Sequence, residues 1–217
     1  WGHFLIDMNG MVVHTWPVTH SQYAEILPDG NLMVGNYGHW IEELTPTGER
    51  VWICGRQYLH DFHVVSRDEI VLLTNRRGPV LPGFYGESCE PEEMLSDVVI
   101  AINRSGDVLW EFPFRDHVDE LHELAGLPLP VRYATLRPGG EVGEIAPRPA
   151  ADWAHTNTIE VLGDTPIGRR DERFRAGNIL FSFRSLDIIG VADLHKGEIV
   201  WAWGLGVLDG QHQPIMT

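Results

Sequence analysis

Four histidines of this chain stand at the start of segments that are similar to one another. The segments read HSQY, HDFH, HTNT and HQPI, and they begin at His20, His60, His155 and His212. Arg184 follows the apolar stretch ILFSF, which comes after the third segment. Imidazoles act as acids, bases or nucleophiles, and the guanidinium fork of arginine matches tetrahedral oxyanions. Residues of these types suit a pocket that binds and transfers an anionic group.

Each of these residues also has a plainer interpretation. A lone histidine at the start of a strand often caps that strand or bonds to the backbone of a neighbour. Arg184 has Asp187 and Asp193 nearby in the sequence as salt-bridge partners. The recurrence of histidine at one repeat position favours a shared site over four separate capping roles.

The elements that would carry these residues are β-hairpins. Residues 3–16, 41–54, 98–112 and 188–203 each read as a strand, a turn with glycine and a second strand. The turn glycines are Gly10, Gly48, Gly106 and Gly197, and the fourth residue after each is His14, Trp52, Trp110 or Trp201. A large residue at a fixed distance from a turn glycine indicates a repeated hairpin. We expect the three tryptophans at equivalent, largely buried sites.

A second family of hairpins alternates with the first, and its members begin at the histidines. Two successive hairpins make a four-stranded antiparallel unit, and repetition of such units predicts an all-β fold, the β-propeller. We expect complete blades at about residues 20–54, 60–112 and 155–203, and partial blades at 1–16 and 210–217. The first strand of each blade lines the central channel, so the histidines and Arg184 would converge there, within about 10 Å of one another.

Two stretches interrupt the repeat. Residues 76–96 are rich in Pro, Gly and Glu and predict an irregular loop, and residues 113–152 contain a short helix around RDHVDELHELAG. A propeller usually has at least four blades. Either the two partial blades close one blade across the termini, or this single propeller domain is part of a larger ring. We favour the larger ring, because the chain stops at Thr217 where an inner strand would begin.

Composition narrows the range of partners. The 31 acidic and 16 basic residues give a net charge of -15, which repels nucleic acid backbones and anionic membranes. No apolar run approaches the roughly 20 residues that cross a bilayer. Cys54 and Cys89 are too few for a disulfide framework. We therefore expect a globular protein that acts on small molecules, with no nucleic acid partner and no membrane span.

Three stretches of the chain resemble the arylsulfotransferase family, whose members transfer sulfuryl groups without a nucleotide sulfate donor. They are DWAHTNTIEVL, NILFSFRSLDIIGVADLHKGEIVWAWG and DGQHQP, and LHDFHVV extends the resemblance to about residues 59–214. The resemblance implies a six-bladed propeller, of which this chain would hold about half. It also implies a periplasmic or secreted protein that moves a sulfuryl group from an aryl sulfate to a phenol in two steps, without a cofactor.

The same resemblance assigns roles to individual residues. The nucleophilic histidine of the family falls on His212, and the sulfate-binding residues fall on His155, Asn157 and Arg184. A further histidine falls on His60 by repeat position, with the neighbouring His63 as the alternative. His20 would contribute to substrate binding by the same repeat logic. The remaining partner would be the missing part of the ring or a second copy of the chain.

Departures from the family pattern keep other interpretations open. The family usually has an acidic residue after the histidine of its Gln-His motif, whereas Gln213 and Pro214 follow His212. Three converging imidazoles would also suit a divalent metal, although no obvious carboxylate accompanies His155 or His212. A non-catalytic binding propeller is the third interpretation. Four aromatic residues would serve as pocket walls or as core: Phe62, Phe84, Tyr85 and Trp153.

Overall fold

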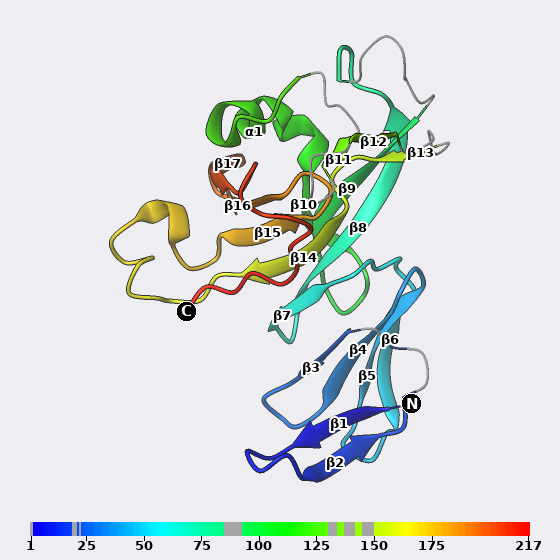
Figure 1. Cartoon of the computed structure of the whole chain (residues 1–217). Helices are drawn as coiled ribbons and strands as arrows, with labels where there is room; N and C mark the ends of the chain where they lie inside the picture. The colour runs from blue at the N-terminus through cyan, green and yellow to red at the C-terminus, as the bar shows by residue number, and fades with distance from the viewer. Residues whose placement is uncertain are drawn as a thin grey trace. The chain divides into compact units, whose positions relative to one another are not determined.

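The computed structural model describes residues 2–18, 21, 23–84, 93–129, 134–136, 142–144 and 150–217, with only the backbone at 134–136, 142–144, 150 and 151. These residues are mostly β-strand with one short α-helix, which confirms the predicted fold class at that level (Figure 1). The chain divides into two compact units, Trp1–Leu72 with Ile100–Trp110 and Leu73–Val99 with Glu111–Thr217. No helix of the described residues is long and apolar enough to cross a bilayer.

The first unit contains a hairpin and a four-stranded antiparallel sheet. The hairpin pairs β1 (His3–Ile6) with β2 (Val12–Trp16). The sheet has the order β3-β4-β5-β6, and its strands are β3 (Tyr23–Ile26), β4 (Leu32–Asn36), β5 (Trp40–Leu44) and β6 (Arg50–Cys54). A core cluster of Trp16, Leu32, Val34 and Leu44 joins the hairpin to this sheet.

A second sheet has the order β10-β9-β8-β7, and β13 pairs with β9 in parallel. Its strands are β7 (Phe62–Ser66), β8 (Glu69–Pro79), β9 (Glu93–Ile102), β10 (Val108–Pro113) and β13 (Ala150–Asp152). The boundaries between the two units fall within β8, β9 and β10, so each of these strands has some residues in one unit and some in the other. Strand structure enters the predicted irregular loop 76–96 from both sides, because β8 continues to Pro79 and β9 begins at Glu93.

The stretch after β10 begins with η1 (Phe114–His117) and α1 (Val118–Ala125), which confirms the predicted short helix. Gly126 ends α1 in the left-handed conformation with φ 72°, and its N–H donates to the carbonyl oxygen of His122. Two short strands, β11 (Ala134–Leu136) and β12 (Val142–Glu144), then pair with each other.

Another four-stranded sheet lies in the second unit and has the order β14-β15-β16-β17. Its strands are β14 (Thr156–Val161), β15 (Ile179–Phe183), β16 (Ile188–Asp193) and β17 (Glu198–Trp203), with η2 (Glu172–Phe174) between β14 and β15. Helix α1 lies against β17 (Figure 1). The Glu120 carboxylate accepts a hydrogen bond from the Ile199 N–H at 2.5 Å.

The turns of the first hairpin family follow one design. The four aligned glycines all have positive φ angles, between 68° and 85°: Gly10, Gly48, Gly106 and Gly197. Each turn begins with a residue whose side-chain oxygen accepts backbone N–H bonds from the turn: Asp7, Thr45, Asn103 and Asp193. Only glycine adopts such angles without strain, and the side-chain bonds satisfy the turn backbone. The spacing of these residues is therefore what makes the repeat visible in the sequence.

The three aligned tryptophans each lie on the last strand of an antiparallel run of four strands, as predicted, but they are half-buried. Trp52 is on β6, Trp110 on β10 and Trp201 on β17. A last strand has a neighbour on one side only, which leaves part of each indole in solvent. The Trp52 Nε1–H donates to the Arg104 carbonyl oxygen at 2.8 Å, and the Trp110 Nε1–H donates to Glu69 Oε1 at 3.0 Å.

Gly190 in β16 is required by close packing. A Cβ atom at this position would lie 2.3 Å from Phe181 Cζ and 2.9 Å from the Trp201 carbonyl oxygen. We expect Gly190→Ala to lower the free energy of unfolding by about 1–3 kcal/mol, measured by urea titration. Gly163→Ala is the matched control, since no described atom lies within 4 Å of a Cβ there. Equal stability of the two variants would contradict this packing.

Candidate active site

The segment that follows β17 is anchored to the sheet by the side chain of Gln211. Its Nε2 lies 3.1 Å from Ser182 Oγ and 3.1 Å from the carbonyl oxygens of Phe183 and Ile188. Phe183 and Ile188 face each other in the last pair of the β15–β16 ladder. The amide therefore binds the ends of two neighbouring strands and fixes the next residue, His212, near this end of the sheet.

Asn157 supports the same segment from β14. The pairing of β14 with β15 shifts between Thr156 and Thr158, and Asn157 is the residue at that bulge. A bulge redirects side chains, and here the Asn157 Nδ2–H donates to the Gln211 carbonyl oxygen at 2.7 Å. The Thr158 hydroxyl donates to Asn157 Oδ1 at 3.1 Å and accepts from the Gln213 N–H at 2.9 Å. The structure thus brings Asn157 together with the residues on both sides of His212.

His212 is exposed, and one of its ring nitrogens is committed to the backbone. Its Nδ1 lies 2.9 Å from the carbonyl oxygen of Gly210. A carbonyl oxygen only accepts hydrogen bonds, so Nδ1 of the neutral ring carries the proton. The lone pair is then on Nε2, which is the form of imidazole that acts as a nucleophile.

His155 is half-buried at the start of β14, and a carboxylate binds it twice. Asp152 Oδ2 lies 2.5 Å from the ring Nδ1, and Asp152 Oδ1 accepts the His155 backbone N–H at 3.1 Å. The hydrogen bond to Asp152 raises the pKa of His155 and outweighs the opposing effect of burial. The charges of Asp152 and Asp97 raise this pKa further, and Arg184 opposes them. His155 therefore favours the charged imidazolium form more than an exposed histidine does.

Asp97 of β9 is a buried carboxyl group beside this pair. Its Oδ2 accepts the Thr156 backbone N–H at 2.7 Å. Burial, together with the charge of Asp152, raises the pKa of Asp97 to about 7. Since the unfolded group ionises near its ordinary value of 3.8, the folded protein holds an extra proton between about pH 4 and 7. Stability contributed by protonated Asp97 is lost as the pH rises through that window.

Asp97→Asn should remove this pH dependence. Because asparagine stays neutral, we expect the variant to gain melting temperature relative to wild type as the pH rises from 4 to 8. The gain corresponds to a free energy on the order of a few kcal/mol. Calorimetry across this range measures it, with Asp68→Asn in an exposed turn as the control. A constant difference between Asp97→Asn and wild type would argue against a raised pKa.

Arg184 lies next to His155 through the backbone, because the Arg184 N–H donates to the His155 carbonyl oxygen at 3.2 Å. Its side chain is exposed. None of the carboxylates that the structure describes lies within ion-pair distance of the Arg184 guanidinium, so the alternative of a salt bridge to Asp187 or Asp193 is wrong. Asp187 Oδ1 instead accepts the Gly210 N–H at 2.7 Å.

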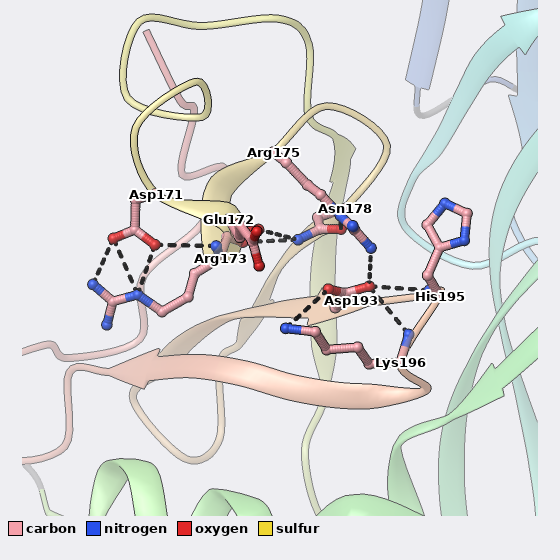
Figure 2. Close-up of polar contacts among 8 residues, drawn as sticks. All are labelled: Asp171, Glu172, Arg173, Arg175, Asn178, Asp193, His195 and Lys196. Carbon is pink, nitrogen blue, oxygen red and sulfur yellow. Dashed lines mark hydrogen bonds and ion pairs between the residues drawn. The ribbon is translucent and has the colours of Figure 1, made fainter.

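Asp193 is engaged by other cations, as Figure 2 shows. Its Oδ1 lies 2.5 Å from Arg175 Nη2, and its Oδ2 lies 3.8 Å from Lys196 Nζ. Burial opposes ionisation of Asp193, but the Lys196 backbone N–H and Arg175 outweigh it and lower the pKa. This ion pair fastens the loop before β15 to the β16–β17 turn and leaves the Arg184 side chain available.

His60 and His63 belong to the first unit. His60 has φ 54°, close to the 47° of His155, which agrees with their equivalent repeat positions. The Tyr58 hydroxyl donates to the His60 carbonyl oxygen at 3.1 Å, and His63 Nδ1 lies 3.9 Å from Glu25 Oε2. That either histidine joins His155 and the others in one site stays a prediction. His20 and Tyr85 lie outside the described residues.

The acidic side of this site was not predicted from the sequence. The interpretation that no carboxylate accompanies His155 is wrong, because Asp152 contacts the ring directly. The signal was present in the stretch DWAH, where the turn at Trp153 and Ala154 folds Asp152 back onto His155. Asp97 has no such local signal, because it reaches the site from another strand.

Three of the four predicted aromatic residues are core residues. Phe62, Phe84 and Trp153 are each at most 2% exposed. The rings of Phe84 and Trp153 meet edge to face with centroids 5.2 Å apart. They stabilise the interior and do not line a pocket. In the part of the chain that the structure describes, no three His, Cys, Asp or Glu side chains gather as metal ligands would.

The described residues form a mostly β protein in which Arg184 bonds to the backbone of His155 and Asn157 bonds to the segment that carries His212. The family model for arylsulfotransferase (ASST) matches residues 2–207. The chain therefore belongs to the arylsulfotransferase family, which supports aryl sulfuryl transfer as its general activity and small aryl molecules as its substrates. A comparison with curated proteins finds no match.

Proposed function

We propose that the protein transfers a sulfuryl group from an aryl sulfate to a phenol through an adduct on His212. The observation that carries this proposal is the hydrogen bond between His212 Nδ1 and the Gly210 carbonyl oxygen, because it leaves the Nε2 lone pair for attack. The exposed position of His212 gives a small substrate access to that atom.

The reaction has two displacements at sulfur. In the first, His212 Nε2 forms a bond to sulfur while the bond from sulfur to the aryl oxygen breaks, and the departing phenolate takes a proton. In the second, the oxygen of the acceptor phenol attacks sulfur, its proton leaves, and the N–S bond breaks. Arg184 and His155 would offset the negative charge on the sulfuryl oxygens in both steps. His60 or His63, with His20, would complete the substrate contacts.

We also propose that the four-stranded sheets are blades of a propeller and that further blades complete its ring. Two equivalent contacts support this arrangement. Glu25 of β3 accepts the Val64 N–H of β7 at 3.0 Å, and Glu160 of β14 accepts the Met216 N–H at 3.0 Å. Each glutamate lies five residues after a candidate histidine, which is His20 for Glu25 and His155 for Glu160. Each N–H donor lies four residues after the following candidate histidine, which is His60 for Val64 and His212 for Met216. The C-terminal segment thus contacts β14 as β7 contacts β3, which is the relation between inner strands of successive blades.

An assay with 4-nitrophenyl sulfate as donor and phenol as acceptor tests the proposed activity. We expect release of nitrophenol that depends on phenol, together with formation of phenyl sulfate. Prior treatment with a chelator should leave the rate unchanged, because no step uses a metal. Release of nitrophenol and free sulfate without phenyl sulfate would contradict transfer, and loss of activity on chelation would favour a metal-dependent enzyme.

A further inference from the structure

Two aspartates from neighbouring strands hold the start of β14. Asp152 ends β13, and Asp97 lies on β9, with which β13 pairs. Asp152 accepts the backbone N–H of His155, and Asp97 accepts that of Thr156. The backbone N–H groups of two successive residues are therefore bound by two carboxyl groups, and the first of these residues, His155, has the left-handed φ of 47°.

Asp152 also determines how the His155 ring is oriented. Its second oxygen binds Nδ1 at 2.5 Å, so that Nδ1 donates and Nε2 points to the opposite side of the ring. A carboxylate at this distance favours the doubly protonated ring over the neutral one. His212 differs, because its Nδ1 contacts a carbonyl oxygen and none of the described carboxylates forms an ion pair with it. A carboxylate contact on Nδ1 thus distinguishes His155 from His212.

We infer that Asp152 is a positioning residue that keeps His155 as an imidazolium, so that its Nε2–H donates to a sulfuryl oxygen or to the departing phenolate. Three ionisable groups of the described residues act on this ring: Asp152 from β13, Asp97 from β9 once it has ionised, and Arg184 after β15. The two aspartates favour the charged ring, and Arg184 disfavours it. The catalytic part of the inference rests on the proposed function, whereas the protonation state of His155 does not.

The direct test is a titration of the histidine ring signals by NMR in wild type and in Asp152→Asn. We expect His155 to titrate above 6.5 in wild type and about one pH unit or more lower in the variant. Asp164→Asn, which removes an exposed carboxylate paired with Arg169, should leave the His155 midpoint unchanged. A wild-type midpoint below 6.5, or one that Asp152→Asn leaves in place, would overturn the inference.

The pH profile of kcat separates chemistry from structure. Because the protonated ring is the active form, activity should fall as the pH rises through the His155 pKa. Asp152→Asn should move this alkaline limb to lower pH by the same amount as the NMR midpoint. If Asp152→Asn moves the NMR midpoint of His155 but not the alkaline limb of the kcat profile, His155 is not the proton donor. If Asp152→Asn moves the His155 midpoint but the wild-type protein shows no sulfuryl transfer, the proposed function is rejected. The effect of Asp152 on the protonation of His155 then still stands.

Asp152→Glu keeps the test decisive if the asparagine variant does not fold. It retains the negative charge but moves the carboxylate along a longer side chain. We expect a His155 midpoint that stays above 6.5 with a kcat about ten-fold lower, since the ring is charged but misplaced. A His155 midpoint below 6.5 in this variant would contradict the charge effect.

Discussion

His212→Asn is expected to abolish release of phenol from an aryl sulfate while the fold stays intact. Asparagine keeps a polar amide at this position but has no lone pair that can hold a sulfuryl group. We expect kcat to fall by about a thousand-fold or more, and additional substrate should not restore the rate. The measurement is initial-rate kinetics together with circular dichroism of the variant.

Intact mass spectrometry shows whether the two-step route is used. After brief incubation with donor and no acceptor, wild type should gain the mass of one SO₃ group, and His212→Asn should not. His195→Asn, which changes an exposed histidine in the β16–β17 turn, is the matched control and should retain both the adduct and the rate. Wild-type turnover by His212→Asn would show that another group is the nucleophile.

Gln211→Glu should have the second-largest effect, because it removes the amide that fixes the segment carrying His212. The side chains have nearly the same shape, but a carboxylate cannot donate to the carbonyl oxygens of Phe183 and Ile188. Repulsion between the new carboxylate and these carbonyl oxygens would move the segment away from the ends of β15 and β16. A displacement of about 1 Å at a reacting group costs about a hundred-fold in rate, so we expect kcat to fall by that order.

The control for this variant is Gln213→Asn, on the other side of His212. Gln213 is exposed and has φ 49°, a conformation that asparagine tolerates. We expect it to retain most of the wild-type rate of adduct formation, measured by mass under conditions where both variants are folded. If Gln211→Glu forms the adduct as fast as wild type, Gln211 does not position His212.

The sequence predicted the local parts of this structure well. Hairpins with a glycine turn and the helix at Val118–Ala125 follow from patterns within a short stretch of chain. These features depend on backbone conformation and on side chains a few residues apart, which are present in the sequence itself.

What depended on distant contacts was not predictable from one sequence. Asp97 reaches Thr156 across 59 residues, and no local pattern distinguishes it from any other strand residue. The spacing also could not show that Asn157 contributes a hydrogen bond to Gln211, because a strand bulge redirects its side chain. The alternative of a salt bridge from Arg184 to Asp193 fails for a similar reason, since Arg175 binds Asp193 from another loop.

The contact between α1 and β17 bears on how the protein behaves in concentrated solution. β17 is the last strand of its sheet, and a last strand offers free N–H groups to which another chain can add a strand. Glu120 occupies the N–H of Ile199 and places a carboxylate at that edge. The helix therefore hinders the addition of a strand from another molecule at this edge of the sheet. A shortened protein without residues 114–127 would be prone to aggregate even if its histidines were all in place.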